Sequence, residues 1–177
     1  MSGHNKWSKV KHKKAASDAK KSKEFGKLVR LLKVEAKKAG GNFESPGLKT
    51  VIEKAKAINM PKDNIERAIR SAEEAGDAEY EPVTYEAYGP GGVAMIIETL
   101  TDSRNRTSAE IKHLFSKHGL SIAAPGAAVW AFTKSERNEW HPNQSMPVPE
   151  AESKQLAELV DELENHDDIQ DVWTNAI

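Results

Sequence analysis

Charge is sorted along this chain into a basic beginning and an acidic remainder. Residues 1–40 hold 13 Lys and Arg against 3 acidic residues, whereas residues 77–177 hold 7 against 18. Residues 41–76 carry 6 of each sign, so the net charge of the whole chain is only −1. This separation favours a polyanionic partner for the first part of the chain, and solvation or a basic partner for the last part.

Composition narrows the class of protein. The chain has 177 residues, enough for one medium domain or two small ones, and it has no cysteine, which excludes disulfides, thiolate metal sites and thiol nucleophiles. No stretch approaches the roughly 20 apolar residues that span a bilayer, and the first residues do not resemble a secretory signal. The basic start MSGHNKW leads into a helical pattern instead of a cleavage region. We therefore expect a cytoplasmic protein with no membrane partner.

The first 23 residues form a lysine-rich arm with few acidic residues to neutralise it. Such an arm gains little by packing, so we expect it to bind phosphates, although a solvated tail is the simpler alternative. Trp7 is either a stacking surface for a base or an anchor that holds the arm on the rest of the protein. The residues of the arm that we expect to contact nucleic acid are Lys6, Trp7, Lys9, Lys11, His12, Lys13, Lys14, Lys20 and Lys21.

Helical periodicity follows the arm. Apolar residues recur at helical spacing from Ser17 to Ala39, before a Gly-Gly stop. A second helix begins at Ser45-Pro46, with Ser as cap, and a third begins after Pro61 and ends near Gly76. We predict a small three-helix bundle over residues 1–76. Its helix lengths suit a helix-turn-helix reader, but acidic residues oppose the two arginines of the third helix, which argues against that mode.

Strand patterns begin after residue 77. VTYEAYG and VAMIIETL, joined by GPGG, predict a hairpin, and further strands are predicted at Ala127 to Thr133 and at DIQDVWTN. Thr107 and Glu110 predict a capping box for one helix, and Glu150 to Asn165 predicts another. The proline-bearing NEWHPNQSMPVP predicts a loop or an irregular edge strand. The fold class is therefore α+β: the three-helix bundle with its basic arm, then residues 77–177 as a small antiparallel sheet with helices packed on one face.

A second candidate contact lies at Arg104, Asn105 and Arg106, just before a predicted helix. Arginine forks and free backbone N–H groups at such a place can hold phosphate. The alternative is that these arginines pair with Asp102 or Glu98.

Other motifs argue against enzymatic chemistry. GPGG lacks the Lys-Ser/Thr of a phosphate-binding loop, and a hairpin turn explains it better. His113 and His118 are five residues apart, which does not place both on one helical face as a zinc pair requires. Serines near these histidines lack a nucleophile motif. We expect no catalytic residue, metal site, cofactor or small-molecule substrate.

Several long motifs occur in order along the chain: GHNKW, KHKKAASDAKK, YEAYGPGG, TDSRNRT and LVDELENHDDIQDVWTN. On these residues the chain resembles the YebC/PmpR family, over about residues 1 to 134 and 141 to 175. That family includes the mitochondrial translational activator of cytochrome oxidase subunit one. The resemblance implies either a DNA-binding transcriptional regulator or a ribosome-associated factor that assists translation of proline-rich stretches.

One departure from the family is large. Members usually carry an additional domain after the strand that matches Ala127 to Lys134, whereas here only SERNE, near residues 135–140, bridges the gap. We interpret this as removal of an inserted domain.

Three classes of function therefore remain open. The leading hypothesis is a nucleic-acid-binding regulator of gene expression, most simply one that binds DNA and controls transcription. The alternative is a translation factor that meets rRNA or mRNA on the ribosome. A protein-interaction adaptor or an unrecognised enzyme is a third class, which the family resemblance disfavours.

Overall fold

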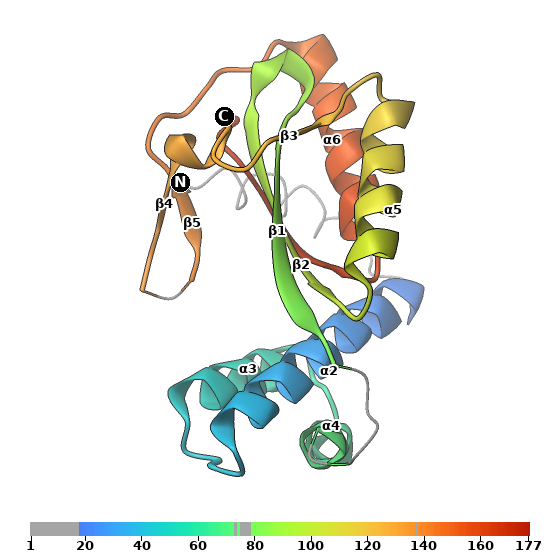
Figure 1. Ribbon diagram of the computed structural model, residues 1–177, viewed down its shortest axis with the longest axis vertical. Coiled ribbons are helices and arrows are strands. Elements are labelled where there is room, and N and C mark those ends of the chain that lie inside the picture. The colour runs from blue at the N-terminus through green and yellow to red at the C-terminus, as the bar shows by residue number, and fades with distance from the viewer. Residues whose placement is uncertain (1–17, 73, 75–78, 137) are drawn as a thin grey trace. The chain divides into compact units, whose positions relative to one another are not determined.

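The computed structural model describes residues 18–72, 74, 79–136 and 138–177 (Figure 1). For residues 18–20 it describes the backbone only. These residues form two compact units: a helical unit, the described residues within 18–82 with 100–102, and a sheet unit, those within 83–99 with 103–177. Residues 75–78, at the expected domain boundary, lie outside the described part, so that boundary stays a prediction. Within the described part, no helix combines the length and the apolar character needed to cross a membrane.

The helical unit consists of α2 (Asp18–Ala39), α3 (Pro46–Ala57) and α4 (Lys62–Ser71). α2 packs against both other helices. Their apolar stripes meet in one core, whose fully buried side chains include Leu32, Leu48 and Ala55. The three predicted helices are thus present, and the third ends at Ser71, earlier than the sequence suggested.

The junction between α3 and α4 follows a standard helix ending. Asn59 has a positive φ of 59°, and the amide of Met60 donates to the carbonyl of Ala55 at 2.9 Å. This is the hydrogen bond of a Schellman ending, in which Asn tolerates the left-handed conformation. At its other end α3 has Ser45 as N-cap and Pro46 at the first turn, as predicted, but the Ser45 side chain makes no capping hydrogen bond.

The sheet unit has a four-stranded sheet in the order β3-β1-β2-β6 and a separate two-stranded hairpin of β4 and β5. Its elements in chain order are β1 (Glu81–Tyr88), η1 (Pro90–Gly92), β2 (Ala94–Thr101), α5 (Arg104–Lys117), β3 (Ile122–Ala123), η2 (Val129–Ala131), β4 (Phe132–Lys134), β5 (Trp140–Pro142), α6 (Glu150–Glu164) and β6 (Ile169–Thr174). β3 pairs antiparallel with β1, and β6 pairs antiparallel with β2. The predicted hairpin of β1 and β2 is present, and η1 forms its turn.

The sheet is covered on both faces. α5 and α6 lie on one face, and η2 with the β4–β5 hairpin lies on the other (Figure 1). Side chains of β2 alternate between the two resulting cores: Met95 and Ile97 belong to the helix side, Ala94 and Ile96 to the hairpin side. The α+β class with helices on one face is therefore confirmed, and the irregular edge strand predicted near His141 is β5.

The predicted strand from Ala127 to Thr133 is mostly wrong. Residues 129–131 form the short 3₁₀ helix η2, and the strand begins only at Phe132. The physical reason is the buried carboxylate of Glu86, which accepts hydrogen bonds from the amides of Gly126, Ala128 and Val129 at 2.6, 2.7 and 2.7 Å. These amides are held by a side chain, so they cannot pair in a strand ladder.

The predicted capping box of Thr107 and Glu110 is also wrong. α5 begins at Arg104, with Ser103 as its N-cap. Thr107 is buried in the first turns of the helix, and its hydroxyl donates to the carboxylate of Asp168 at 2.5 Å. A partner 61 residues away in the sequence therefore determines the role of this threonine.

Glu86 provides a test of how the loop before β4 is held. Burial by itself raises the pKa of Glu86, but the three backbone hydrogen bonds together outweigh it and lower the pKa below the ordinary 4.5. We expect Glu86→Gln to lower the free energy of unfolding by about 1–3 kcal/mol near neutral pH, because an amide NH₂ cannot accept these hydrogen bonds.

The pH dependence follows from the lowered pKa. The stabilisation from the Glu86 carboxylate is fully present above pH 4.5 and is lost as the pH falls through the folded-state pKa. Urea unfolding of the wild type and Glu86→Gln over this range should show their difference shrinking in acid. Glu139→Gln, an exposed change in the same unit, is the control. A difference that stays constant with pH would contradict the role given to Glu86.

Candidate nucleic-acid interface

Helix α2 follows the N-terminal arm in the sequence and is itself rich in basic residues. It contains eight Lys and Arg against three acidic residues. At 3.6 residues per turn, the positions Lys20, Lys23, Lys27, Arg30 and Lys37 fall on one side of the helix. We call these five positions the basic face of α2. The buried Leu32 and Ala36 lie on the opposite side.

Part of this basic face already has partners within the helical unit. The guanidinium of Arg30 lies over the ring of Tyr80, 5.3 Å from its centroid, and the ammonium of Lys37 donates to the carboxylate of Glu79. The hydrogen bond and the charge of Lys37 lower the pKa of Glu79. The end of α2 is thus partly neutralised by the segment that leads into β1, while Lys21 and Lys23 near its start are exposed.

The structure places the predicted contact residues unequally. Lys20 and Lys21 lie at the start of α2, whereas seven predicted residues of the arm lie outside the described residues: Lys6, Trp7, Lys9, Lys11, His12, Lys13 and Lys14. Their contacts stay predictions. The roles of Lys20 and Lys21 likewise stay predictions.

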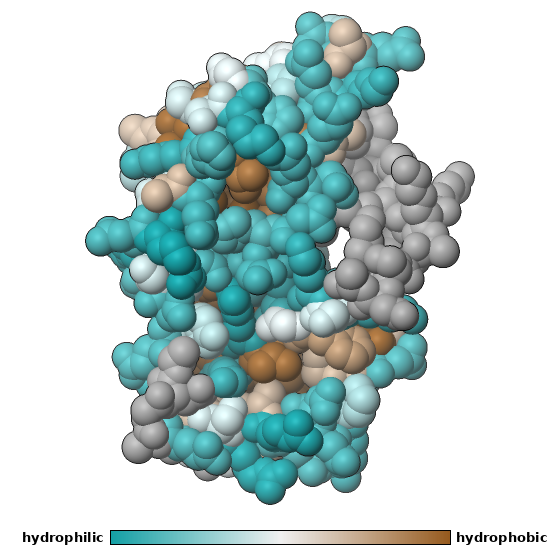
Figure 2. Space-filling model, turned by 90° about the vertical axis from the view of Figure 1, so that its right-hand side faces the viewer, coloured by the Kyte–Doolittle hydropathy of each residue, from teal (hydrophilic) through white to brown (hydrophobic). Residues whose placement is uncertain are grey.

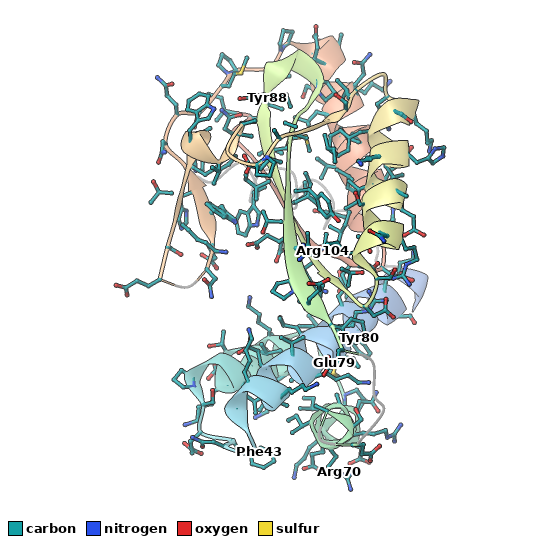
Figure 3. All side chains as sticks on the ribbon, in the orientation of Figure 1. Phe43, Arg70, Glu79, Tyr80, Tyr88 and Arg104 are labelled. Carbon is teal, nitrogen blue, oxygen red and sulfur yellow. The ribbon has the colours of Figure 1, made fainter. Side chains whose placement is uncertain are left out.

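Arg104, Asn105 and Arg106 form the first turn of α5, and all three are exposed. Figure 3 marks Arg104 at the start of this helix. Arg106 bonds the buried carboxylate of Asp168, with its Nη2 atom 2.8 Å from Oδ2. Its Nε atom also lies 3.9 Å from Glu110. The sequence suggested Glu98 as a partner, which is wrong: Glu98 accepts from Lys134 at 2.9 Å and from Trp140 at 3.0 Å. A phosphate at this turn would have to compete with Asp168 for Arg106.

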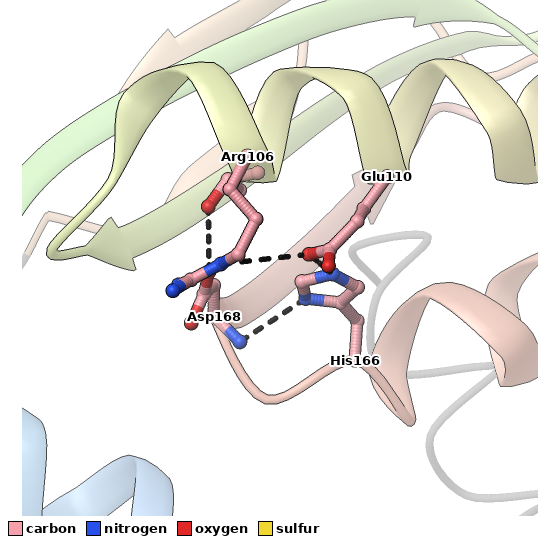
Figure 4. Close-up of polar contacts among 5 residues, drawn as sticks. Arg106, Glu110, His166 and Asp168 are labelled. Atoms are coloured by element: carbon pink, nitrogen blue, oxygen red, sulfur yellow. Dashed lines mark hydrogen bonds and ion pairs between the residues drawn. The ribbon is translucent and has the colours of Figure 1, made fainter.

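Figure 4 shows that this pair belongs to a larger network. Nε2 of His166 lies 2.8 Å from a carboxylate oxygen of Glu110, and the amide of Asp168 donates to Nδ1 of His166 at 3.1 Å. Because Nδ1 accepts a hydrogen bond, the ring proton resides on Nε2 and is donated to Glu110. Helix α5 is thereby bonded to the turn between α6 and β6.

The same network brings together three groups that could each offer a ligand atom to a cation. Carboxylate and imidazole atoms of Glu110, His166 and Asp168 all lie within 4.8 Å of one another. Both ring nitrogens of His166 are engaged, however, and the guanidinium of Arg106 occupies Asp168, where its positive charge opposes a metal ion. The geometry favours an internal ion-pair network. Sequence reasoning considered only His113 and His118 and missed His166, because no local pattern connects it with Glu110.

The family model described as the TACO1/YebC protein N-terminal domain matches residues 5–75, and the model described as the TACO1/YebC second and third domain matches residues 80–137 and 133–176. The chain belongs to the TACO1/YebC family. The resemblance seen in the sequence motifs is therefore confirmed.

Curated relatives in the TACO1/YebC family carry the name probable transcriptional regulatory protein. One from Thermotoga petrophila is 49% identical over 162 residues, which are 90% of this chain and 61% of the relative. One from Thermotoga maritima is 53% identical over 136 residues, which are 76% of this chain and 54% of the relative. The chain thus spans between half and two thirds of the length of these relatives.

A solved structure of the same architecture is a conserved hypothetical protein from Aquifex aeolicus. It is 31% identical to this chain, with a TM-score of 0.85, and the alignment covers 97% of this chain and 96% of that one. The TACO1/YebC fold described above is therefore shared with an experimental structure.

The pairing of Arg106 with Asp168 can be tested by stability. The side chain of Asp168 is only 3% exposed, so removing its cation leaves a buried charge with less compensation. Because the side chain of Arg106 is itself 46% exposed, we expect Arg106→Ala to lower the free energy of unfolding by a moderate amount, about 1–3 kcal/mol. Asn105→Ala, in the same helical turn, should change it by about 0.5 kcal/mol or less.

A double-mutant cycle provides the decisive measurement. If the two side chains form the pair described, Arg106→Ala combined with Asp168→Asn should cost less than the sum of the single changes. Strict additivity in urea unfolding would contradict the pairing.

Proposed function

We propose that this chain is a nucleic-acid-binding regulator of gene expression, in the first place a DNA-binding regulator of transcription. The observation that carries the proposal is the basic face of α2, because it continues the lysine-rich arm into an ordered helix. Its positive charges lie opposite the apolar core, so the helix can bind phosphates without unpacking. The names of the curated relatives agree with this class of function.

The proposed binding mode is mainly electrostatic. Lysine and arginine contacts to phosphate supply affinity that does not depend on base sequence. α4 is a poor candidate for a recognition helix, since Lys62 is paired with Glu66 at 3.3 Å and Asp63 adds further negative charge. We therefore assign α2 and the arm to phosphate contacts. Arg104 and Asn105, at the first turn of α5, are additional proposed contacts.

A second candidate function is that of a ribosome-associated translation factor. It is favoured by the acidic helix α6, which has six acidic residues and one lysine in 15 residues. The outward faces of α5 and α6 are largely hydrophilic (Figure 2). The acidic face of α6 would repel a second stretch of phosphates but could contact a basic protein beside RNA.

We also propose that the chain lacks a segment that its longer relatives carry. Two features support this: the second family model matches in two parts that meet at residues 133–137, and the β4–β5 hairpin closes at the same place. The amide of Ser135 donates to the carbonyl of Glu139 at 2.8 Å, so a short turn joins the two strands. The activities of the longer relatives come to this chain only as proposals.

The basic face of α2 makes a quantitative prediction. Replacing Lys20, Lys23 and Lys27 by Gln should flatten the dependence of duplex affinity on salt, by about 2–3 in the slope of log K against log salt, since each lost phosphate contact releases fewer counterions. The matched control replaces Lys49, Lys54 and Lys56, exposed residues of α3, which removes the same charge. Equal slopes for the two triple variants would contradict a role for α2.

The two candidate functions separate in a direct comparison. Affinities for duplex DNA and for purified ribosomes should be measured side by side across a salt series. A transcriptional regulator should keep tight, sequence-dependent duplex binding at physiological salt. Weak and fully salt-sensitive duplex binding together with firm ribosome binding would instead establish the translation factor.

A further inference from the structure

An exposed indole borders a hollow on the sheet unit, lined by residues that the candidate interface above does not include. Trp130 in η2 is 62% exposed, and Tyr88 at the end of β1 is 37% exposed. Together they form one wall of a hollow of about 200 Å³, whose other lining includes Gln144, Ser145, Met146 and Asn175. Large apolar side chains are normally buried, as Trp173 is in the same unit at 7% exposure.

The fold holds this aromatic wall in a fixed position. Nε1 of Trp130 donates to the carbonyl of Ala127 at 2.9 Å and to the hydroxyl of Tyr88 at 3.2 Å. The Tyr88 hydroxyl donates to the same Ala127 carbonyl. The loop itself is bonded to Glu86 through its amides, as described above. The indole is therefore both exposed and preorganised, which lowers the entropic cost of using it as a binding surface.

The opposite wall is equally well ordered. The Asn175 side chain accepts from the amide of Ala94 at 2.8 Å and donates to the carbonyl of Gln144 at 3.2 Å. The Gln144 and Ser145 side chains are exposed, so they can form hydrogen bonds with polar atoms of a ligand in the hollow.

Size and chemistry restrict the ligand. The hollow is smaller than the roughly 300–1,000 Å³ of sites for drug-sized molecules, so it suits one planar ring. Among the described residues that line it none has a charged side chain, so they offer a phosphate group no counter-ion. A stable contact with a second copy would need about 1,000 Å² of buried surface, and the large exposed apolar side chains described in this unit are only Tyr88, Trp130 and Ile177.

We propose that Trp130 and Tyr88 form a stacking site for one unpaired base of an RNA strand, with Gln144 and Ser145 available to its polar edge. RNA loops and bulges present unpaired bases to aromatic side chains, whereas duplex DNA keeps both faces of each base covered. This inference rests on the nucleic-acid binding proposed above, and it favours the RNA partner of the second candidate function.

The stacking site is separate from the phosphate contacts at α5. Tyr88 lies at the end of the sheet opposite Arg104 (Figure 3). β1 has eight residues, so these two ends are roughly 26 Å apart at about 3.3 Å per residue. A substitution at Trp130 can therefore be tested without disturbing Arg104.

The experiment compares a short single-stranded oligouridylate with an RNA of the same length and charge that lacks bases. We expect Trp130→Ala to weaken binding of the oligouridylate by about 5- to 100-fold and to leave the abasic strand and duplex DNA unchanged. Trp130→Phe, which keeps an aromatic ring without the N–H group, should bind the oligouridylate nearly as well as the wild type. The α2 triple variant should weaken both strands equally, because both present the same phosphates.

The outcomes are distinct. Unchanged affinity of Trp130→Ala for the oligouridylate, or an equal loss on the abasic strand, would overturn the stacking site. So would a Trp130→Phe variant as weak as Trp130→Ala, because an aromatic ring at this position would then not support binding. Sedimentation that shows a wild-type dimer dissociated by Trp130→Ala would assign the surface to a second copy instead. If the α2 variant alone has no effect on either strand, the electrostatic proposal fails while the stacking site stands.

Discussion

Strand β2 is buried on both faces, and the arrangement of the sheet unit depends on this constraint. Successive side chains of a strand point to opposite faces, so Ile96 and Ile97, both 0% exposed, each need a separate apolar cover. Burying a side chain of this size contributes about 1.5–3 kcal/mol. Helices α5 and α6 cover one face, and η2 with the β4–β5 hairpin covers the other. The chain after β2 must therefore supply a covering layer for each face of the sheet.

Two buried carboxylates then fix the ends of these layers. Glu86 holds the loop before β4 through three amides, and Asp168 holds the first turns of α5 through Arg106 and Thr107. Buried carboxylates are stable only when hydrogen bonds or opposite charges compensate for the lost contact with water. The groups bonded to each carboxylate therefore have few alternative positions. Two of the proposed contacts in the sheet unit lie next to these carboxylates. Trp130 follows the loop that Glu86 holds, and Arg104 begins the helix that Asp168 holds.

The two units offer chemically different surfaces for the proposed binding of nucleic acid. The helical unit offers charge along α2, which suits phosphates of any sequence, and the sheet unit offers an uncharged aromatic surface, which suits an exposed base. The acidity of α6 complements this division, because it discourages phosphates from binding along that helix. Lys117 satisfies one of its carboxylates, Glu162, at 2.7 Å, and this hydrogen bond lowers the pKa of that group.

The sequence by itself determined the three helices, the β1–β2 hairpin, α6, β6 and the excess of basic residues over the arm and α2, because each depends on a local period or a local sum of charges. It could not determine η2, the start of α5 or the partner of Arg106. Those features depend on Glu86, Asp168 and His166, which lie about 40 to 60 residues away from the groups they bond. The two-residue strand β3 was too short to show a period. Only the tertiary structure could bring these side chains together, because a buried carboxylate overrides local propensity once its partners are within hydrogen-bonding distance.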